Sequence, residues 1–277
     1  MSKSENRRRS LRRRGIYLLP NMLTTAALFA GFYAVVAAMD GSFVRAAIAI
    51  FVAMVLDGVD GRVARLTGTD SDFGKEYDSL SDMVSFGLAP ALVIYQWGLQ
   101  HVTDNSIPWG RLGWLAAFCY SVGAALRLAR FNTREVADKR FFEGLASPSG
   151  AGLVAGWVWV AAQYQLTGNA ALVPAFIVTA GGGALMVSAF RYYSFKEFNL
   201  GERIRFTQVI MVPAVFVLIS LNPPVVLFIM FALYAITGPA FSVFRFIRRR
   251  RRRQAEKAVA DETPATSVDN NSDTGTG

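Results

Sequence analysis

Residues 57–82 read DGVDGRVARLTGTDSDFGKEYDSLSD and carry aspartates in two closely spaced pairs. Asp57 and Asp60 lie three residues apart, and Asp78 and Asp82 lie four residues apart. On an α-helix, residues three or four apart share a face, so each pair presents both carboxylates to the same side. The segment between the pairs is polar and contains glycines, so the chain can turn back there and bring the two pairs together.

The sequence on either side of this stretch is that of a membrane protein. The chain has 277 residues, 53% apolar and 18% charged, whereas soluble domains are roughly 45–50% apolar and about 25% charged. Residues 1–15 carry a net charge of +6 and residues 245–277 a net charge of +3, which leaves residues 16–244 formally neutral. A neutral apolar body between two basic ends excludes a disordered protein and disfavours an ordinary soluble enzyme.

Eight apolar runs approach the length of about 20 residues that a helix needs to cross a membrane. They cover residues 16–38, 43–56, 83–100, 112–131, 150–166, 170–190, 207–221 and 224–244. The run at 43–56 is long enough only if its helix continues through Asp57. The first run exceeds the roughly 7–15 residues of a signal-peptide core, so we expect it to be retained.

We therefore predict an all-α polytopic membrane protein with eight transmembrane helices. A basic segment, residues 1–15, precedes a membrane domain at 16–246. An arginine-rich segment and a disordered tail, residues 247–277, follow it.

Lys and Arg are distributed unevenly between the two sides of this predicted bundle. The connections at 39–42, 101–111, 167–169 and 222–223 contain one base, Arg111. The other side receives both basic ends and the remaining charged connections, and basic loops are typically cytoplasmic. We expect both termini and the aspartate pairs to face the cytoplasm, from the inner membrane if the chain is bacterial. The arginine runs adjoin predicted spans, so we expect them to contact anionic lipid headgroups rather than nucleic acid.

Four carboxylates that converge at a membrane border repel one another unless a cation holds them. Oxygen ligands without Cys or His favour a hard divalent ion, Mg²⁺ or Mn²⁺. Two such ions can bind phosphate oxygens and stabilise the attacking and leaving oxygens of a displacement. Two other interpretations stay open: ordinary helix-terminal acids in a solvated loop, and a divalent-cation transporter.

The spacing D-x2-D-G-x2-A-R-x8-G-x3-D-x3-D resembles the signature of the CDP-alcohol phosphatidyltransferases, integral membrane enzymes of phospholipid synthesis. Its fixed positions are Asp57, Asp60, Gly61, Ala64, Arg65, Gly74, Asp78 and Asp82. The resemblance implies that the four aspartates bind two divalent ions and that Asp82 is the general base on the acceptor alcohol. It also implies a set of residues that contact the CDP-lipid: Asn21, Thr24, Gly61, Arg65 and Ser71.

Later stretches resemble the phosphatidylserine synthase branch of that family. They are RLARFN at 127–132, FEGLASPSG at 142–150 and YYSFK at 192–196, although Ala146 stands where the branch usually has Pro. The resemblance covers about residues 16–200 and implies CDP-diacylglycerol and L-serine as substrates. The residues we expect to contact serine are Arg127, Arg130, Asn132 and Ser147.

The sequence leaves the acceptor and the oligomeric state open. Glycerol 3-phosphate, choline or an inositol compound would need the same site, and Arg127, Arg130 and Lys196 also suit a phosphorylated acceptor. The small-residue spacing Gly152–Gly156 fits close helix packing, either within one chain or in a homodimer.

Overall fold

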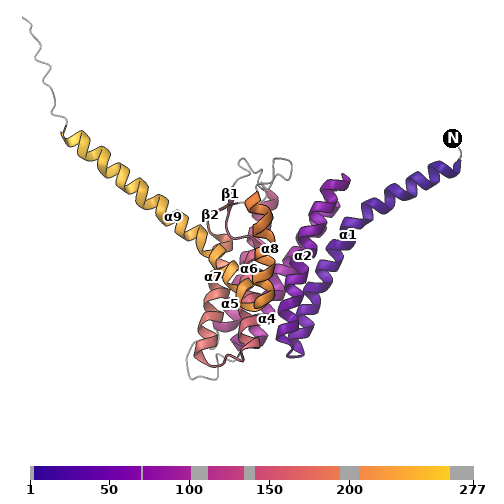
Figure 1. Ribbon diagram of the computed structural model, residues 1–277, viewed down its shortest axis with the longest axis horizontal. Coiled ribbons are helices and arrows are strands. Elements are labelled where there is room, and N and C mark those ends of the chain that lie inside the picture. The colour runs from indigo at the N-terminus through magenta and orange to yellow at the C-terminus, as the bar shows by residue number, and fades with distance from the viewer. Residues whose placement is uncertain (1–2, 70, 101–111, 134–140, 194–205, 263–277) are drawn as a thin grey trace, which may run out of the picture. The chain divides into compact units, whose positions relative to one another are not determined.

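The computed structural model describes residues 3–69, 71–100, 112–133, 141–193 and 206–262 (Figure 1). Its first helices are α1 (Lys3–Met39), α2 (Phe43–Thr67), α3 (Asp72–Asp82), the π-helical turn η1 (Met83–Leu88) and α4 (Ala89–Trp97). The later elements are α5 (Leu112–Thr133), β1 (Phe141–Glu143), α6 (Ser147–Gln163), α7 (Asn169–Val187), β2 (Arg191–Tyr193), α8 (Phe206–Leu221) and α9 (Pro223–Glu262).

The predicted helical architecture is confirmed, and every predicted span coincides with helix in the part of the chain that the structure describes. Within those residues, four stretches are long and apolar enough to cross a membrane: Leu19–Met39, Leu112–Thr133, Asn169–Val187 and Pro223–Ser242. The count of eight spans stays a prediction. The helix at α2 continues through Asp57 as expected, but it contains five charged residues, and α6 and α8 have only 17 and 16 residues.

Two features differ from the prediction. The three-residue strands β1 and β2 form an antiparallel ribbon in which Glu143 stands opposite Arg191. Helix α9 continues to Glu262, so part of the segment expected to be disordered is helical, whereas residues 263–277 lie outside the described chain. The structure divides into two units, Met1–Gly238 and Pro239–Gly277, and the features below belong to the first.

Helices α1 and α2 form a tight pair that places the first aspartates (Figure 1). The turn between them uses Gly41 at φ +71°, a left-handed conformation that glycine adopts without steric cost. Their facing surfaces are rich in fully buried alanines, such as Ala34, Ala46 and Ala53, and small side chains let two helix backbones approach closely. This packing fixes the rotation of α2 and therefore the direction in which its carboxylates point.

Helix α3 and η1 pack across α1 through hydroxyl groups. Ser81 Oγ donates to the Thr24 carbonyl at 3.2 Å, and Ser85 Oγ donates to the Ala27 carbonyl at 3.2 Å. A Cβ on Gly31 would lie 2.8 Å from the Cα of Ser85, so glycine is required for the close approach. The second aspartate pair is thus held against the helix that precedes the first pair.

Helix α5 covers the π-helical turn. Tyr120 is fully buried and donates from its hydroxyl to the Phe86 carbonyl at 3.0 Å, and Ser121 donates to the Gly87 carbonyl at 3.3 Å. On its other side α5 meets α7, where a Cβ on Gly183 would lie 2.8 Å from the Tyr120 Cα. The same tyrosine therefore couples three elements of the bundle.

The α5–α7 contact gives a stability prediction with an internal control. Gly183→Ala should lower the midpoint of thermal unfolding in detergent, because the added methyl group meets the backbone of Tyr120. Gly181→Ala, two residues earlier in α7, should leave the midpoint unchanged or raise it, since nothing lies within 4 Å of its Cβ position. Equal midpoints for the two variants would contradict the packing described.

Candidate active site

Three of the four aspartates of the sequence motif meet in the structure. One carboxylate oxygen each from Asp57, Asp60 and Asp78 lies within 4.8 Å of the other two. Asp57 and Asp60 come from the end of α2, and Asp78 comes from the middle of α3. Asp60 is only 4% exposed. The two pairs therefore converge as the sequence predicts.

Asp82 joins this cluster from the last residue of α3. A side-chain hydrogen bond links it to Asp57, and the positive charge of Arg127 acts on it. Burial raises the pKa of Asp82 to about 9, with the negative charges of Asp57 and Asp78 adding to the rise and Arg127 opposing it. Burial also raises the pKa of Asp78 to about 7, and the charges of Asp57 and Asp60 act in the same direction. The cluster is an electrostatically crowded group of acids.

The cluster fits a divalent cation by its chemistry. Oδ1 of Asp78 is buried and has no hydrogen-bond partner among the described residues, although buried carboxylate oxygens are normally satisfied. Burial, and after it the negative charges of neighbouring acids, raise the pKa values of Asp78 and Asp82, and a bound cation would favour the ionised carboxylates. Oxygen ligands alone suit Mg²⁺ or Mn²⁺.

Helix α1 contributes Thr24 to the cluster. The Thr24 hydroxyl, on a residue that is 5% exposed, donates to Oδ2 of Asp60 at 2.7 Å. Burial raises the pKa of Asp60, and this hydrogen bond opposes the rise. Thr24 therefore favours the ionised carboxylate and holds it in one orientation, as partners of metal-binding carboxylates commonly do.

Removal of the Thr24 hydroxyl should weaken metal binding. We expect Thr24→Val to lower the affinity for Mn²⁺ by about tenfold, the effect typical of an outer partner of a metal ligand. Calorimetric titration of the purified protein with Mn²⁺ measures this without reference to turnover. The neighbouring Thr25→Val is the control, because Thr25 is exposed and bonds the Asn21 carbonyl and Tyr77 instead. Equal Mn²⁺ affinities of the two variants would contradict the role of Thr24.

A small cavity of about 100 Å³ adjoins the aspartates. It is lined by residues of α1, α2 and the start of α3, four of which the family resemblance assigns to the CDP-lipid: Asn21, Thr24, Gly61 and Ser71. Ser71 caps α3 by accepting a hydrogen bond from the Gly74 amide at 3.0 Å. A Cβ on Gly61 would meet nothing within 4 Å, which leaves open space beside Asp60. Arg65 is exposed in the last turn of α2 and is not among the described residues that line the cavity.

The residues expected to contact the acceptor lie on α5 and at the start of α6. Arg127 donates to the buried Ser147 hydroxyl at 2.9 Å, and its charge lies close to Asp82. Nε of Arg127 is buried without a partner among the described residues. Asn132 donates to the Ser79 hydroxyl at 2.9 Å, next to Asp78 in sequence. These bonds connect α5 to the start of α6 and to α3, the helix that carries Asp78 and Asp82.

Arg130, the fourth residue expected at the acceptor, has partners that the sequence did not indicate. Its guanidinium forms an ion pair with Glu143 and donates to the Val187 carbonyl at 3.3 Å. Glu143 stands in the quoted stretch 142–150, but nothing in the spacing of that stretch connects it with Arg130. Tyr234 of α9, whose phenol interacts electrostatically with Arg127, was likewise not predicted.

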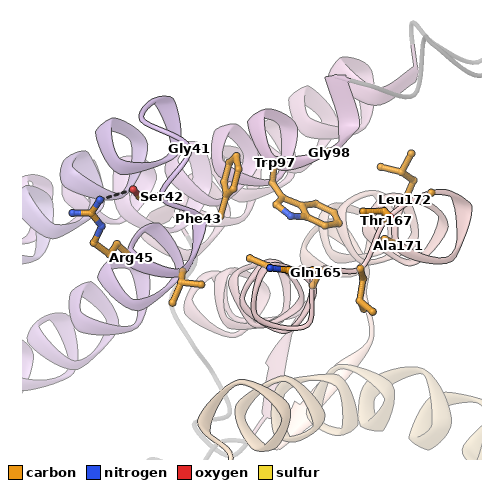
Figure 2. A pocket seen from close by; sticks show the side chains of 15 residues that line it. Gly41, Ser42, Phe43, Arg45, Trp97, Gly98, Gln165, Thr167, Ala171 and Leu172 are labelled. Carbon is orange, nitrogen blue, oxygen red and sulfur yellow. Dashed lines mark hydrogen bonds between the residues drawn. The ribbon is translucent and has the colours of Figure 1, made fainter.

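A larger cavity, about 680 Å³, lies at the other end of α2 (Figure 2). It is formed by the α1–α2 turn, the end of α4 and the α6–α7 connection, with Trp97 and Gln165 facing it and Arg45 donating to Ser42. Asp57 is 14 residues beyond Phe43, or about 21 Å along a helix. Since no acid is among the described lining residues, chemistry rather than size identifies the aspartate cluster as the candidate active site.

Comparison with known sequences agrees with the geometry. The sequence profile described as CDP-alcohol phosphatidyltransferase matches residues 17–187, which span α1 to α7 and contain the whole aspartate cluster. The chain belongs to this family. The family signature thus coincides with the site that the packing of α1, α2, α3 and α5 builds.

Relatives of this phosphatidyltransferase family are similar over most of the chain. A CDP-diacylglycerol–serine O-phosphatidyltransferase of Helicobacter pylori (strain J99) is 36% identical over 236 residues, covering 84% of this chain and 94% of the relative. A protein of the same name from Mycobacterium leprae is 38% identical over 165 residues, 57% of this chain and 52% of the relative. The archaetidylserine synthase of Methanothermobacter thermautotrophicus is 33% identical over 176 residues, 63% of this chain and 69% of the relative.

Proposed function

We propose that this chain transfers the phosphatidyl group from CDP-diacylglycerol to L-serine, with phosphatidylserine and CMP as products. The observation that carries the proposal is the convergence of Asp57, Asp60 and Asp78 beside a cavity lined by the motif residues of α1 and α2. Two Helicobacter pylori relatives, matched over 94% and 90% of their length, are both CDP-diacylglycerol–serine O-phosphatidyltransferases, which supports serine as the acceptor. The arginines of α5 suit an acceptor that carries a carboxylate.

The four aspartates are the proposed ligands of two divalent ions, Mg²⁺ or Mn²⁺. When bound, such ions neutralise charge on the diphosphate and on the departing CMP. Oδ1 of Asp78 is buried without a hydrogen-bond partner among the described residues, which supports this assignment, as do the negative charges of Asp57 and Asp60 close to Asp78. Thr24 orients Asp60 through its hydrogen bond.

The reaction is a displacement at the lipid-side phosphorus of the CDP-lipid. The serine hydroxyl oxygen forms the new bond to that phosphorus, and the bond from phosphorus to the bridging oxygen of the diphosphate breaks. CMP departs with the bridging oxygen, and the hydroxyl proton passes to Asp82. Asp82 suits this role as general base because it lies between the carboxylates of the cluster and Arg127 of the acceptor side.

The CDP group of the lipid is proposed to occupy the small cavity between α1 and α2. Asn21, Thr24, Gly61 and Ser71 line it, and the bare backbone of Gly61 permits a phosphate or ribose to approach closely. Arg65 follows in the last turn of α2, where its exposed guanidinium is available to the diphosphate.

Serine is proposed to bind between α5 and the start of α6. Arg127 and Arg130 offer guanidinium groups to its carboxylate and to the lipid phosphate, and Asn132 and Ser147 offer polar contacts. Arg127 bonds Ser147 of α6 and acts electrostatically on Asp82, and Asn132 bonds Ser79, the residue that follows Asp78. An amino-acid alcohol bound there places its hydroxyl toward Asp82.

The placement in the membrane is also part of the proposal. Eight spans with both termini in the cytoplasm would put the aspartate cluster at the cytoplasmic border of the membrane. Both the CDP-lipid and serine could reach it there. The basic ends, residues 1–15 and 247–277, would then contact anionic lipid headgroups. The catalytic domain is residues 16–246. The small-residue spacing in α6 supports close packing within one chain and not a homodimer, because a Cβ on Gly152 or Gly156 would meet Phe231 or Phe228 of α9.

The deciding experiment measures CMP release by the purified protein in detergent. CDP-diacylglycerol and Mn²⁺ or Mg²⁺ are supplied with serine, glycerol 3-phosphate, choline or inositol phosphate in turn. Release that requires both serine and metal is the expected result. Release with a different acceptor would keep the site and overturn the substrate. No release from folded protein with any acceptor would overturn the proposed chemistry and favour a cation transporter.

A further inference from the structure

We infer that Glu143 is a specificity-determining residue that binds the ammonium group of the acceptor, beside Arg130 at its carboxylate. The inference rests on the proposed serine transfer and extends it, because the family resemblance assigns no role to Glu143. With Arg130, the carboxylate of Glu143 makes the acceptor site suitable for an amino alcohol that carries both a carboxylate and an ammonium group. The observation that carries it is a paired cation and anion at the acceptor side of the site.

The backbone around Glu143 is fixed by a strand end and a turn that have no other role in the proposed mechanism. It is the last residue of β1, where the register of the ribbon sets it opposite Arg191. Gly144 follows at φ +83°, and a Cβ there would lie 2.2 Å from the Met186 carbonyl oxygen. The amides of Gly144 and Leu145 donate to carbonyls of Phe190 and Leu185 at 2.8 and 3.0 Å. This anchored turn fixes the carboxylate of Glu143 only four residues before Ser147.

Along helix α5, Arg130 lies between two residues that contact other parts of the site, Arg127 and Asn132. One helical turn before it, Arg127 bonds Ser147 and lies close to Asp82. Two residues after it, Asn132 bonds Ser79 of α3. Arg130 shares a face of α5 with Arg127, so the Arg130–Glu143 pair lies one helical turn from the guanidinium that acts on Asp82.

The pair is accessible to a small polar ligand. The side chain of Arg130 is 27% exposed and that of Glu143 is 40% exposed, so neither is sealed by protein. Arg130 has five N–H donors, and its bonds to Glu143 and Val187 leave others for a ligand carboxylate. The Glu143 carboxylate has several acceptor sites and can hold a guanidinium and an ammonium together.

The charges match serine and oppose the rival acceptors. L-Serine carries its carboxylate and its ammonium group on the same carbon atom, and this pair of charges fits a guanidinium beside a carboxylate. Glycerol 3-phosphate has no ammonium group and brings further negative charge to Glu143. Choline has a cation without N–H donors and no carboxylate for Arg130. Repulsion of wrong ligands and attraction of the right one both contribute to specificity.

A plainer role for Glu143 is to hold Arg130 in place, and a ligand without an amino group separates the two roles. 3-Hydroxypropionate is serine without its amino group, so it retains every contact except that with Glu143. If Glu143 only positions Arg130, its removal weakens serine and 3-hydroxypropionate alike. If Glu143 binds the ammonium group, only serine is weakened.

The test compares Glu143→Gln with wild type in detergent, using formation of phosphatidylserine from CDP-diacylglycerol and labelled serine, because the hydroxyl of 3-hydroxypropionate can itself release CMP. We expect KM for serine to rise about tenfold or more, the cost of an exposed charge-assisted contact, with kcat nearly unchanged. The inhibition constant of 3-hydroxypropionate against serine should stay within about threefold of the wild-type value. Glu76→Gln is the matched control, because Glu76 is exposed on the side of α3 opposite Asp78.

Two results would overturn the inference: an unchanged KM for serine, or an equal loss of serine and 3-hydroxypropionate affinity. Glu143→Asp keeps the carboxylate and should retain most of the preference for serine, which guards against a misfolded Gln variant. Wild-type protein that releases no CMP with serine would instead contradict the proposed function, so the two failures are distinguishable.

Discussion

Replacement of Asp78 by Asn is expected to lower CMP release by about a thousandfold or more, since a missing metal ligand forfeits several kcal/mol of transition-state stabilisation. Asp78 lies within 4.8 Å of the Asp57 and Asp60 carboxylate oxygens, and its own Oδ1 has no other partner among the described residues. The substitution keeps the size of the side chain and removes one negative charge. The fold should therefore survive, and thermal unfolding in detergent checks that it does.

The matched control for this prediction is Asp72→Asn on the same helix. Asp72 is fully exposed in the first turn of α3 and pairs with Lys75 at 3.7 Å, away from the cluster. It should retain near wild-type activity. Calorimetric titration with Mn²⁺ should show weakened binding only for Asp78→Asn. Near-full activity of Asp78→Asn would refute the site assignment.

The second large effect is expected at Arg127. Arg127→Gln should lower kcat/KM for serine by about a hundredfold and leave the KM for CDP-diacylglycerol within a few-fold. The reason is that the guanidinium of Arg127 bonds Ser147 and opposes the pKa rise of Asp82, and that its Nε is buried without a partner among the described residues. Its removal takes away a proposed acceptor contact and a positive charge that acts on the proposed base.

Steady-state kinetics with each substrate varied in turn measures this effect. Arg45→Gln is the control, because Arg45 is exposed at the far end of α2, where it donates to Ser42. Equal losses for serine and CDP-diacylglycerol in Arg127→Gln would mean that Arg127 supports the whole site rather than the acceptor.

The aspartate cluster could be predicted because helical spacing is visible in sequence. Asp57 with Asp60, and Asp78 with Asp82, share helix faces, and a polar connection returns the chain. The structure confirms the convergence. The bond from Thr24 to Asp60 joins residues 36 positions apart and was not predicted, because the family resemblance assigned Thr24 only to the CDP-lipid.

Other contacts at the site leave no periodic signal. Arg130 and Glu143 are 13 residues apart on either side of a chain reversal, so their pairing depends on how α5 and the β1–β2 ribbon meet. Three-residue strands are too short for an alternating pattern to reveal them. The interaction of Tyr234 with Arg127 depends on the docking of α9 against Tyr192, whose hydroxyl donates to the Ala235 carbonyl at 2.9 Å.

The number of membrane spans was harder to predict than the helices themselves. Apolar runs identify helix well, and all eight runs coincide with helix in the described residues. Whether α2, α6 and α8 cross the membrane depends on charged residues near their ends and on cover by neighbouring helices. Composition alone does not report either property.

The π-helical turn Met83–Leu88 determines how helix α3, which carries Asp78 and Asp82, is rotated relative to helix α4. A π turn is equivalent to one residue inserted into an α-helix, and one residue corresponds to about 100° of rotation. Asp82 immediately precedes it, and the buried face of α4 follows it. The loss of one residue here would leave composition and length almost unchanged, yet would turn Asp78 and Asp82 about a quarter of a circle away from Asp57 and Asp60. In this family member, the alignment of the two aspartate pairs depends on helical winding as much as on the aspartates themselves.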